Sequence, residues 1–142
     1  MILVDANILI YAVNQDAALH QPAKSWLEST LAGDEPVAFS WNVILAFLRL
    51  MTRPGLFVHP LVPETAFDIV AAWMEVPSVT QVHPGSRHLR ILRNLLQPIG
   101  TAGNLTSDAH LAALAIEHGA ELCSADTDFA RFPGLNWRNP LS

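Results

Sequence analysis

Four aspartates stand beside apolar segments, where an isolated carboxylate would be costly to bury. Asp5 directly follows the apolar residues 1–4, and Asp126 and Asp128 come just after the apolar residues 121–123. Asp108 lies in the first turn of a helix predicted at 106–118. A carboxylate that leaves water loses solvation free energy unless a partner compensates it. The first question is therefore what these four acids face.

The elements that position them follow from the hydrophobic pattern. Short apolar runs alternate with longer helical patterns, which is typical of an α/β fold with a parallel sheet. We expect strands at 1–4, 36–39, 78–82, 121–123 and 135–137, and helices at 6–13, 20–31, 41–52, 64–74, 86–96, 106–118 and, as one turn, 129–132. Ser40 is expected to cap the helix at 41–52 and Gly119 to end the helix at 106–118. Residues 98–104 are expected to form a loop.

This arrangement brings distant acids to one place. Ligands of an open parallel sheet bind beyond the carboxyl ends of its strands, where Asp5 and Asp126 stand and to which Asp108 points back. For each acid taken alone, the simpler explanation is that it caps a helix or stabilises its first turn. Together, however, crowded carboxylates repel and raise one another's pKa unless a cation lies between them. Oxygen ligands suit Mg²⁺ or Mn²⁺, and such sites usually serve phosphate chemistry. We therefore expect Asp5 to face a divalent metal.

Composition narrows the class of protein. The 142 residues most simply form one domain, 1–142, and 51% hydrophobic content is ample for a core. One cysteine, Cys123, excludes an intrachain disulfide and fits a reducing compartment. No apolar run approaches the ~18 residues of a membrane span, so a cytoplasmic protein with no membrane contact is expected. The net charge of −5 argues weakly against nucleic acid, but metal-binding acids would distort that count.

Three segments carry a family resemblance: "LVDANILIYA", "TSDAHLAALAIEHGAEL" and "SADTDFARFPGL". In this order and spacing they resemble the PIN domains, specifically the VapC-type toxin ribonucleases of type II toxin–antitoxin pairs. The similarity runs from Met1 to the closing "NPL". It implies a three-layer α/β/α sandwich with a central, mostly parallel sheet, and an endoribonuclease that depends on Mg²⁺ or Mn²⁺. It also implies a VapB-type antitoxin as partner and a homodimer.

The resemblance assigns roles to individual residues. Asp5, Asp108 and Asp126 match the metal-binding, catalytic acids of the family. Ser124 matches a hydroxyl position and Asn7 a polar position, and with Asp128 they are expected in the outer shell of the site. Either Asn7 or Ser124 would hold water or a phosphate oxygen, or only bond within its own turn.

One position departs from the family pattern. The family usually carries a glutamate in the helix after the second strand, but no acid occurs between Glu35 and Glu64. The aligned residue is Ala46, or alternatively Ile44. We therefore expect one well-occupied metal and weak or no binding at a second site.

Basic and aromatic residues allow two readings. Arg87, Arg90 and Arg93 recur every third residue on the helix at 86–96, as a solvated face or as a contact for RNA or antitoxin. Arg49, near the missing acid, is a further candidate for such a contact. His110 is expected beside the site or at the surface. Packing in the core is expected for the tryptophans Trp26, Trp41 and Trp73.

Other functions fit less well. A phosphoryl-receiving signalling domain needs a lysine on a late strand, and the only lysine is Lys24 in an early helix. A phosphatase would need an Asp-x-Asp motif after the first strand, where the chain has Asp5, Ala6 and Asn7. A catalytically weak or inactive PIN-like domain that acts by binding RNA or an antitoxin remains the alternative, because the glutamate is missing.

Overall fold

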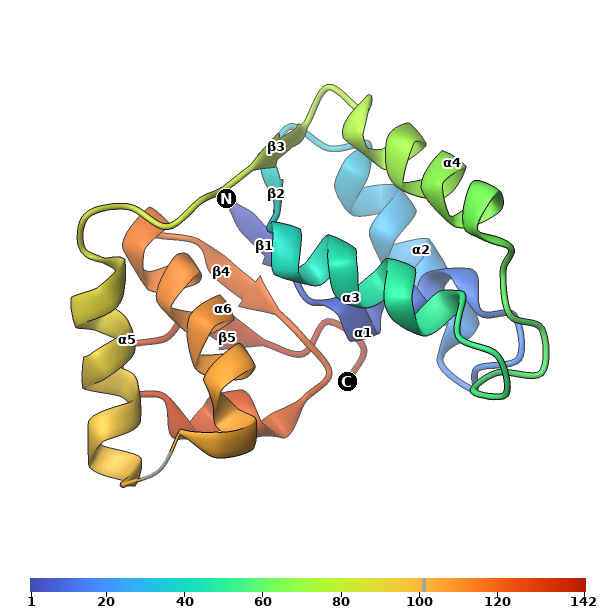
Figure 1. Ribbon diagram of the computed structural model, residues 1–142. Helices are drawn as coiled ribbons and strands as arrows, with labels where there is room; N and C mark the ends of the chain where they lie inside the picture. The colour runs from blue at the N-terminus through green and yellow to red at the C-terminus, as the bar shows by residue number, and fades with distance from the viewer. Residues whose placement is uncertain (101) are drawn as a thin grey trace.

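A five-stranded sheet, in which every neighbouring pair of strands is parallel, forms the centre of the computed structural model, which describes residues 1–100 and 102–142 (Figure 1). In chain order the strands are β1 (Ile2–Val4), β2 (Val37–Phe39), β3 (Val79–Gln81), β4 (Glu121–Cys123) and β5 (Trp137–Arg138). Their spatial order is β3-β2-β1-β4-β5. The chain thus builds outward from β1 on one side and then on the other, which makes the boundary between β1 and β4 the switch point of the sheet.

The helices pack in two groups on the sheet (Figure 1). One group contains α1 (Ala6–Val13), α2 (His20–Leu31), α3 (Trp41–Met51) and α4 (Pro63–Met74), and the other pairs α5 (His88–Leu96) with α6 (Thr106–His118). Every residue of β1 and β2 is buried, so both faces of the sheet are covered there. The expected α/β/α sandwich with a parallel sheet is confirmed.

The apolar residues of α3 explain why this helix lies against the sheet. Val43, Ile44, Phe47 and Met51 recur at helical spacing and are all buried in the main core. The opposite side is exposed, and it includes Trp41, whose exposed fraction is 49%. The expectation that Trp41 packs in the core was wrong, because the first residue of α3 lies outside this apolar stripe.

Most element boundaries were predicted to within two residues, and two local expectations were wrong. Ser40 stands at the N-cap of α3, but its hydroxyl donates to the Asn42 side chain instead of accepting a helix N–H. Short 3₁₀ turns at Gln97–Ile99 and Gly103–Leu105 occupy much of the expected loop, of which Thr101 lies outside the described residues. Among the described helices, none is long and apolar enough to cross a membrane.

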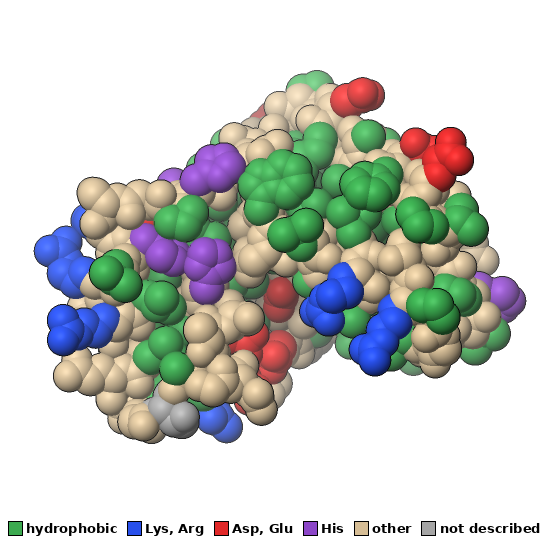
Figure 2. Space-filling model, in the orientation of Figure 1, with side chains coloured by type: hydrophobic (Ala, Val, Ile, Leu, Met, Phe, Trp, Pro, Cys, Tyr) green, Lys and Arg blue, Asp and Glu red, His purple; other side chains and the backbone are tan. Residues whose placement is uncertain are grey.

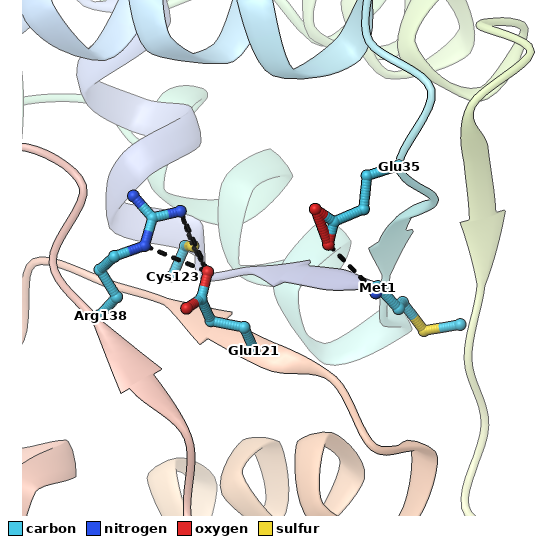
Figure 3. Close-up of polar contacts among 5 residues, drawn as sticks. All are labelled: Met1, Glu35, Glu121, Cys123 and Arg138. Atoms are coloured by element: carbon cyan, nitrogen blue, oxygen red, sulfur yellow. Dashed lines mark hydrogen bonds and ion pairs between the residues drawn. The ribbon is translucent and has the colours of Figure 1, made fainter.

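Two polar contacts link neighbouring strands: one lies just before β1 and β2, and the other joins the start of β4 to the end of β5 (Figure 3). The Met1 amino group lies 3.2 Å from a Glu35 carboxylate oxygen, and Arg138 donates from Nε and Nη2 to Glu121 at 3.1 and 3.0 Å. Cys123 lies beneath the second pair with its side chain fully buried. These surface pairs contribute little stability individually, so the core holds the strands together.

Burial should make Cys123 chemically inert. Burial raises the pKa of the Cys123 thiol to about 12, and the nearby Arg138 guanidinium only partly offsets this. Because the thiolate is the reactive form, native protein should react with a thiol reagent far more slowly than protein unfolded in urea. Time-resolved labelling followed by mass spectrometry measures the two rates. Equal rates would show that Cys123 is accessible in the native state.

Candidate active site

The switch point of the sheet places Asp5 and Ser124 side by side. Val4 pairs with Cys123 in the parallel register of β1 and β4, and each is followed at once by one of these polar residues. The backbone N–H of Asp5 extends the ladder by donating to the Cys123 carbonyl at 3.0 Å. Strand pairing alone therefore brings together residues 119 positions apart in the sequence.

A partly buried network of hydrogen bonds orients the Asp5 carboxylate. Ser124 Oγ donates to Asp5 Oδ2 at 2.6 Å, the N–H of Ala6 donates to Oδ1 at 2.7 Å, and Asn7 Nδ2 approaches Oδ2 at 3.4 Å. Burial raises the pKa of Asp5, the bonds from Ser124 and Ala6 oppose this, and the charge of Asp126 adds to it. Asp5 is also the N-cap of α1, because its side chain accepts the N–H of Ala6. It therefore caps a helix and at the same time lies at the edge of the sheet where the other acids were expected.

The Ser124 hydroxyl is fully used within the protein. It donates to Asp5, and it accepts from Asn7 Nδ2 at 3.1 Å and from the N–H of Asp126 at 3.0 Å. A hydroxyl has one hydrogen and two lone pairs, so none remains for a ligand. The side chain is also fully buried. Of the two readings of Ser124, the structure favours internal bonding: it orients Asp5 rather than holding water or phosphate.

Three other aspartates gather beside this network. Asp108, Asp126 and Asp128 each offer a carboxylate oxygen, and these oxygens all lie within 4.8 Å of one another. Asp108 comes from the first turn of α6, while Asp126 caps the 3₁₀ helix η3 (Thr127–Arg131) by accepting the N–H of Asp128 at 2.9 Å. Asp128 was expected outside the metal shell, yet the turn of η3 carries it into the group.

Negative charge accumulates at this group. Burial raises the pKa of Asp108 to about 6, and the charges of Asp126, Asp5 and Asp128 add to the rise. Within the described part of the chain, the only ion pair to these acids joins Arg131 to Asp128 at 3.8 Å, at an exposed position. These ligands are all oxygen atoms, they are half-buried, and little positive charge compensates them. Such a group fits a hard divalent cation such as Mg²⁺ or Mn²⁺.

A cavity of about 570 Å³ opens between α3 and α6 beside the acids. Its lining consists of Asp5, Ala6, Asn42, Val43, Leu45, Ala46, Arg49, Ser107, Asp108 and Leu111. Ala46 lines it, whereas Ile44 is buried and does not. The geometry therefore favours Ala46 over Ile44 as the position of the missing glutamate. In Figure 2, acidic side chains lie inside a hollow near the centre of the view, and basic side chains lie at the surface beside α3.

The four arginines predicted to contact RNA or antitoxin lie in two different places. Arg49 lines the cavity with the acids, but Arg87, Arg90 and Arg93 lie on or next to α5 and do not line it. Arg87 Nη2 donates to the Glu117 carbonyl at 2.9 Å, and Arg93 borders a separate hollow of about 430 Å³. The structure thus brings one of the four candidate arginines to the acids.

Sequence reasoning missed the contacts that attach α6 to α5. The Glu117 carboxylate accepts the N–H groups of Gly85 and Arg87 at 2.7 and 3.0 Å, and His110 Nδ1 lies 2.9 Å from His88 Nε2. Burial, and then His88, lowers the pKa of His110. These contacts hold the helix that carries Asp108, but they join segments more than twenty residues apart, and no local pattern signals them. Asn42, which also lines the cavity, was not named from the sequence. Its position could have been inferred, because it lies one helical turn before Ala46 and therefore on the same side of α3.

Known proteins are similar to this chain over nearly its whole length. The PIN domain family model matches residues 2–135. Ribonuclease VapC37 of Mycobacterium tuberculosis is 49% identical over 140 residues, which cover 99% of this chain and 97% of that protein. Ribonuclease VapC33 of the same organism is 40% identical over 141 residues, which cover 99% of each.

Solved structures agree on the fold at lower sequence identity. VapBC2 of Rickettsia felis, bound to a promoter DNA fragment, superposes with a TM-score of 0.71 at 19% identity over 98% of each chain. VapC20 of Mycobacterium tuberculosis, described as a toxin that cleaves the sarcin–ricin loop, gives 0.66 at 18% identity over 96% of this chain and 99% of that one. The family match and the relatives lead to the same conclusion: the chain belongs to the PIN-domain family and groups with its VapC members.

Proposed function

We propose that this protein is the toxin of a toxin–antitoxin pair and an endoribonuclease that depends on Mg²⁺ or Mn²⁺. The observation that carries the proposal is the group Asp108, Asp126 and Asp128, which stands with Asp5 beside an open cavity at the switch point of a PIN-type sheet. Relatives up to 49% identical over nearly the whole chain bear the name ribonuclease. Acids that hold a divalent cation beside an open cavity are suited to hydrolysis of a phosphodiester, because the cation can neutralise charge on the phosphate and activate water.

Asp5, Asp108 and Asp126 would hold the metal, and the Asp128 carboxylate lies close enough to Asp108 and Asp126 to join them. A divalent cation held there would supply a lowered pKa for water and positive charge for the phosphate. The protein supplies the orientation: Ser124 and Asn7 fix Asp5, and the turn of η3 fixes Asp126 and Asp128. The carboxylate oxygens accept hydrogen bonds from water and direct a lone pair of that water toward phosphorus.

The partners follow from the relatives. Structures of VapBC complexes contain an antitoxin. We propose that this protein binds a VapB-type antitoxin and an RNA substrate. We further propose that it forms a homodimer and acts in the cytoplasm. We also propose that residues 1–142 act as one domain. The arginines Arg87, Arg90 and Arg93 remain predicted contacts for RNA or antitoxin, away from the acids.

Replacing a metal ligand tests the function directly. Asp108→Asn and Asp5→Asn should abolish cleavage of RNA by purified protein and growth inhibition on expression, because each removes a charge that holds the cation. Asp68→Asn, an exposed acid on α4, is the matched control and should keep full activity. Sequencing of RNA ends after brief expression measures cleavage. If wild type fails to cut RNA in the presence of either metal, the inactive binding domain becomes the better reading.

The stability of the metal-free protein should depend on Asp108. Its pKa rises from 3.8 to about 6 on folding, so the folded state binds the proton more tightly. Stability is therefore fully present below about pH 4 and decreases as the pH rises toward 6. In chelator, Asp108→Asn should be more stable than wild type at pH 7 by on the order of 1 kcal/mol, after allowance for partial exposure. The advantage should vanish near pH 4.

Urea unfolding at the two pH values measures this difference. Asp68→Asn should show no comparable pH-dependent gain, because its side chain is exposed and lies outside the acid group. A wild type that gains stability from pH 4 to pH 7 relative to Asp108→Asn would show that the pKa of Asp108 is lowered rather than raised.

Restoring the missing acid should change metal binding. With no acid on α3, we expect wild type to bind one Mn²⁺ per chain, because two divalent cations about 4 Å apart repel strongly and need several carboxylates between them. Ala46→Glu should tighten metal binding or raise activity at low metal. Ala71→Glu, at an exposed position of α4, should do neither. Calorimetric titration with Mn²⁺ measures stoichiometry and affinity, and two tight sites in wild type would contradict this account.

A further inference from the structure

The cavity beside the acids holds one arginine, Arg49. It lies in the last turn of α3, three residues after Ala46, and both side chains line the cavity with Asp5 and Asp108. Residues three apart on a helix are neighbours on its surface. The arginine therefore stands next to the position where the family glutamate is replaced by a methyl group.

The Arg49 guanidinium is available to a ligand. Helix α3 contains no acid, and among the described residues Arg49 makes no ion pair within 4.0 Å and no side-chain hydrogen bond. Asp5, one of the two acids that line the cavity with Arg49, already accepts hydrogen bonds from Ser124 and Ala6. A cation that shares a cavity with carboxylates yet pairs with none of them is placed to meet an anion that enters between them.

The chemistry of the cavity identifies that anion. Carboxylates line one wall and would carry the metal, while Arg49 stands on the wall formed by α3. A phosphodiester between them would meet positive charge on both sides. A guanidinium can donate two parallel hydrogen bonds to phosphate oxygens. A second metal ion would supply positive charge but no such hydrogen bonds. At about 570 Å³ the cavity has room for a nucleotide phosphate.

We propose that Arg49 is a catalytic residue that binds the scissile phosphate of RNA and stabilises charge on the leaving oxygen. It takes the place of the second cation that a glutamate at position 46 would help to hold. In the reaction the oxygen of water bonds to phosphorus and one bridging P–O bond breaks. The hydrogens of the water end on the new phosphate monoester and the leaving hydroxyl, and Arg49 stays protonated throughout. The proposal rests on the ribonuclease function proposed above.

Arg53 provides a matched control. It is an exposed arginine one turn further along the chain, just beyond the end of α3, and it does not line the cavity. With the RNA that wild type cuts and at saturating Mn²⁺, Arg49→Ala should lower kcat/KM by about 10²-fold or more. Arg53→Ala should stay close to wild type. Arg49→Lys should be intermediate, because an ammonium keeps the charge but not the planar pair of donors.

A binding measurement separates contact with RNA from the assembly of the metal site. In chelator, a labelled single-stranded RNA should bind Arg49→Ala with a log–log salt slope smaller by about 0.7 than for wild type or Arg53→Ala. Calorimetric titration with Mn²⁺ should give the same stoichiometry for Arg49→Ala as for wild type. Because Arg49 is exposed, none of these variants should alter the unfolding midpoint greatly.

The outcomes distinguish the two proposals. Wild type that cuts no RNA contradicts the proposed function, whereas wild type that cuts RNA equally well with Arg49→Ala overturns only the role of Arg49. A normal salt slope combined with loss of antitoxin binding would also overturn it and assign Arg49 to the protein partner. Loss of Mn²⁺ binding in Arg49→Ala would show that the residue supports the metal site instead.

Discussion

Repulsion among carboxylates at the carboxyl edge of the sheet is the constraint on which the rest of the structure depends. Asp5, Asp108, Asp126 and Asp128 come from three regions of the chain. Burial, and then the charges of the other three acids, raise the pKa of Asp108. Such a group forms only if other interactions hold it. Here they are the parallel pairing of β1 with β4, the saturated hydroxyl of Ser124, and the attachment of α6 to α5 through Glu117. The fold thus stores unfavourable electrostatic energy that a bound divalent cation would relieve.

The missing acid on α3 alters how that charge is balanced. A methyl group at Ala46 leaves the cavity less negative on the side of α3, and Arg49 adds a positive charge one turn further on. The cavity is therefore polarised, with oxygen ligands toward α6 and a guanidinium toward α3. We infer that one metal and one arginine together provide the positive charge that two metals provide in other phosphodiesterases.

The sequence predicted the strands, most helix boundaries and the convergence of Asp5, Asp108 and Asp126, because these follow from local hydrophobic period and from the rule for parallel sheets. It predicted Asp128 only as an outer-shell candidate, because the tight turn of η3 decides how close its carboxylate comes to the others. It left open whether Ser124 bonds within the protein, since its partner Asp5 lies far away in the sequence. The expectation for Trp41 was wrong, because the residue lies outside the apolar stripe of α3.

We infer that the four acids form a cation site and that a bound metal relieves the repulsion among them. Thermal unfolding of wild type and Asp108→Asn, each with chelator and with increasing Mn²⁺, tests it most directly. A ligand that binds only the folded state raises Tm by mass action. We expect a saturable rise in Tm for wild type and a much smaller one for Asp108→Asn. An equal rise in both proteins, or none in wild type, would contradict it.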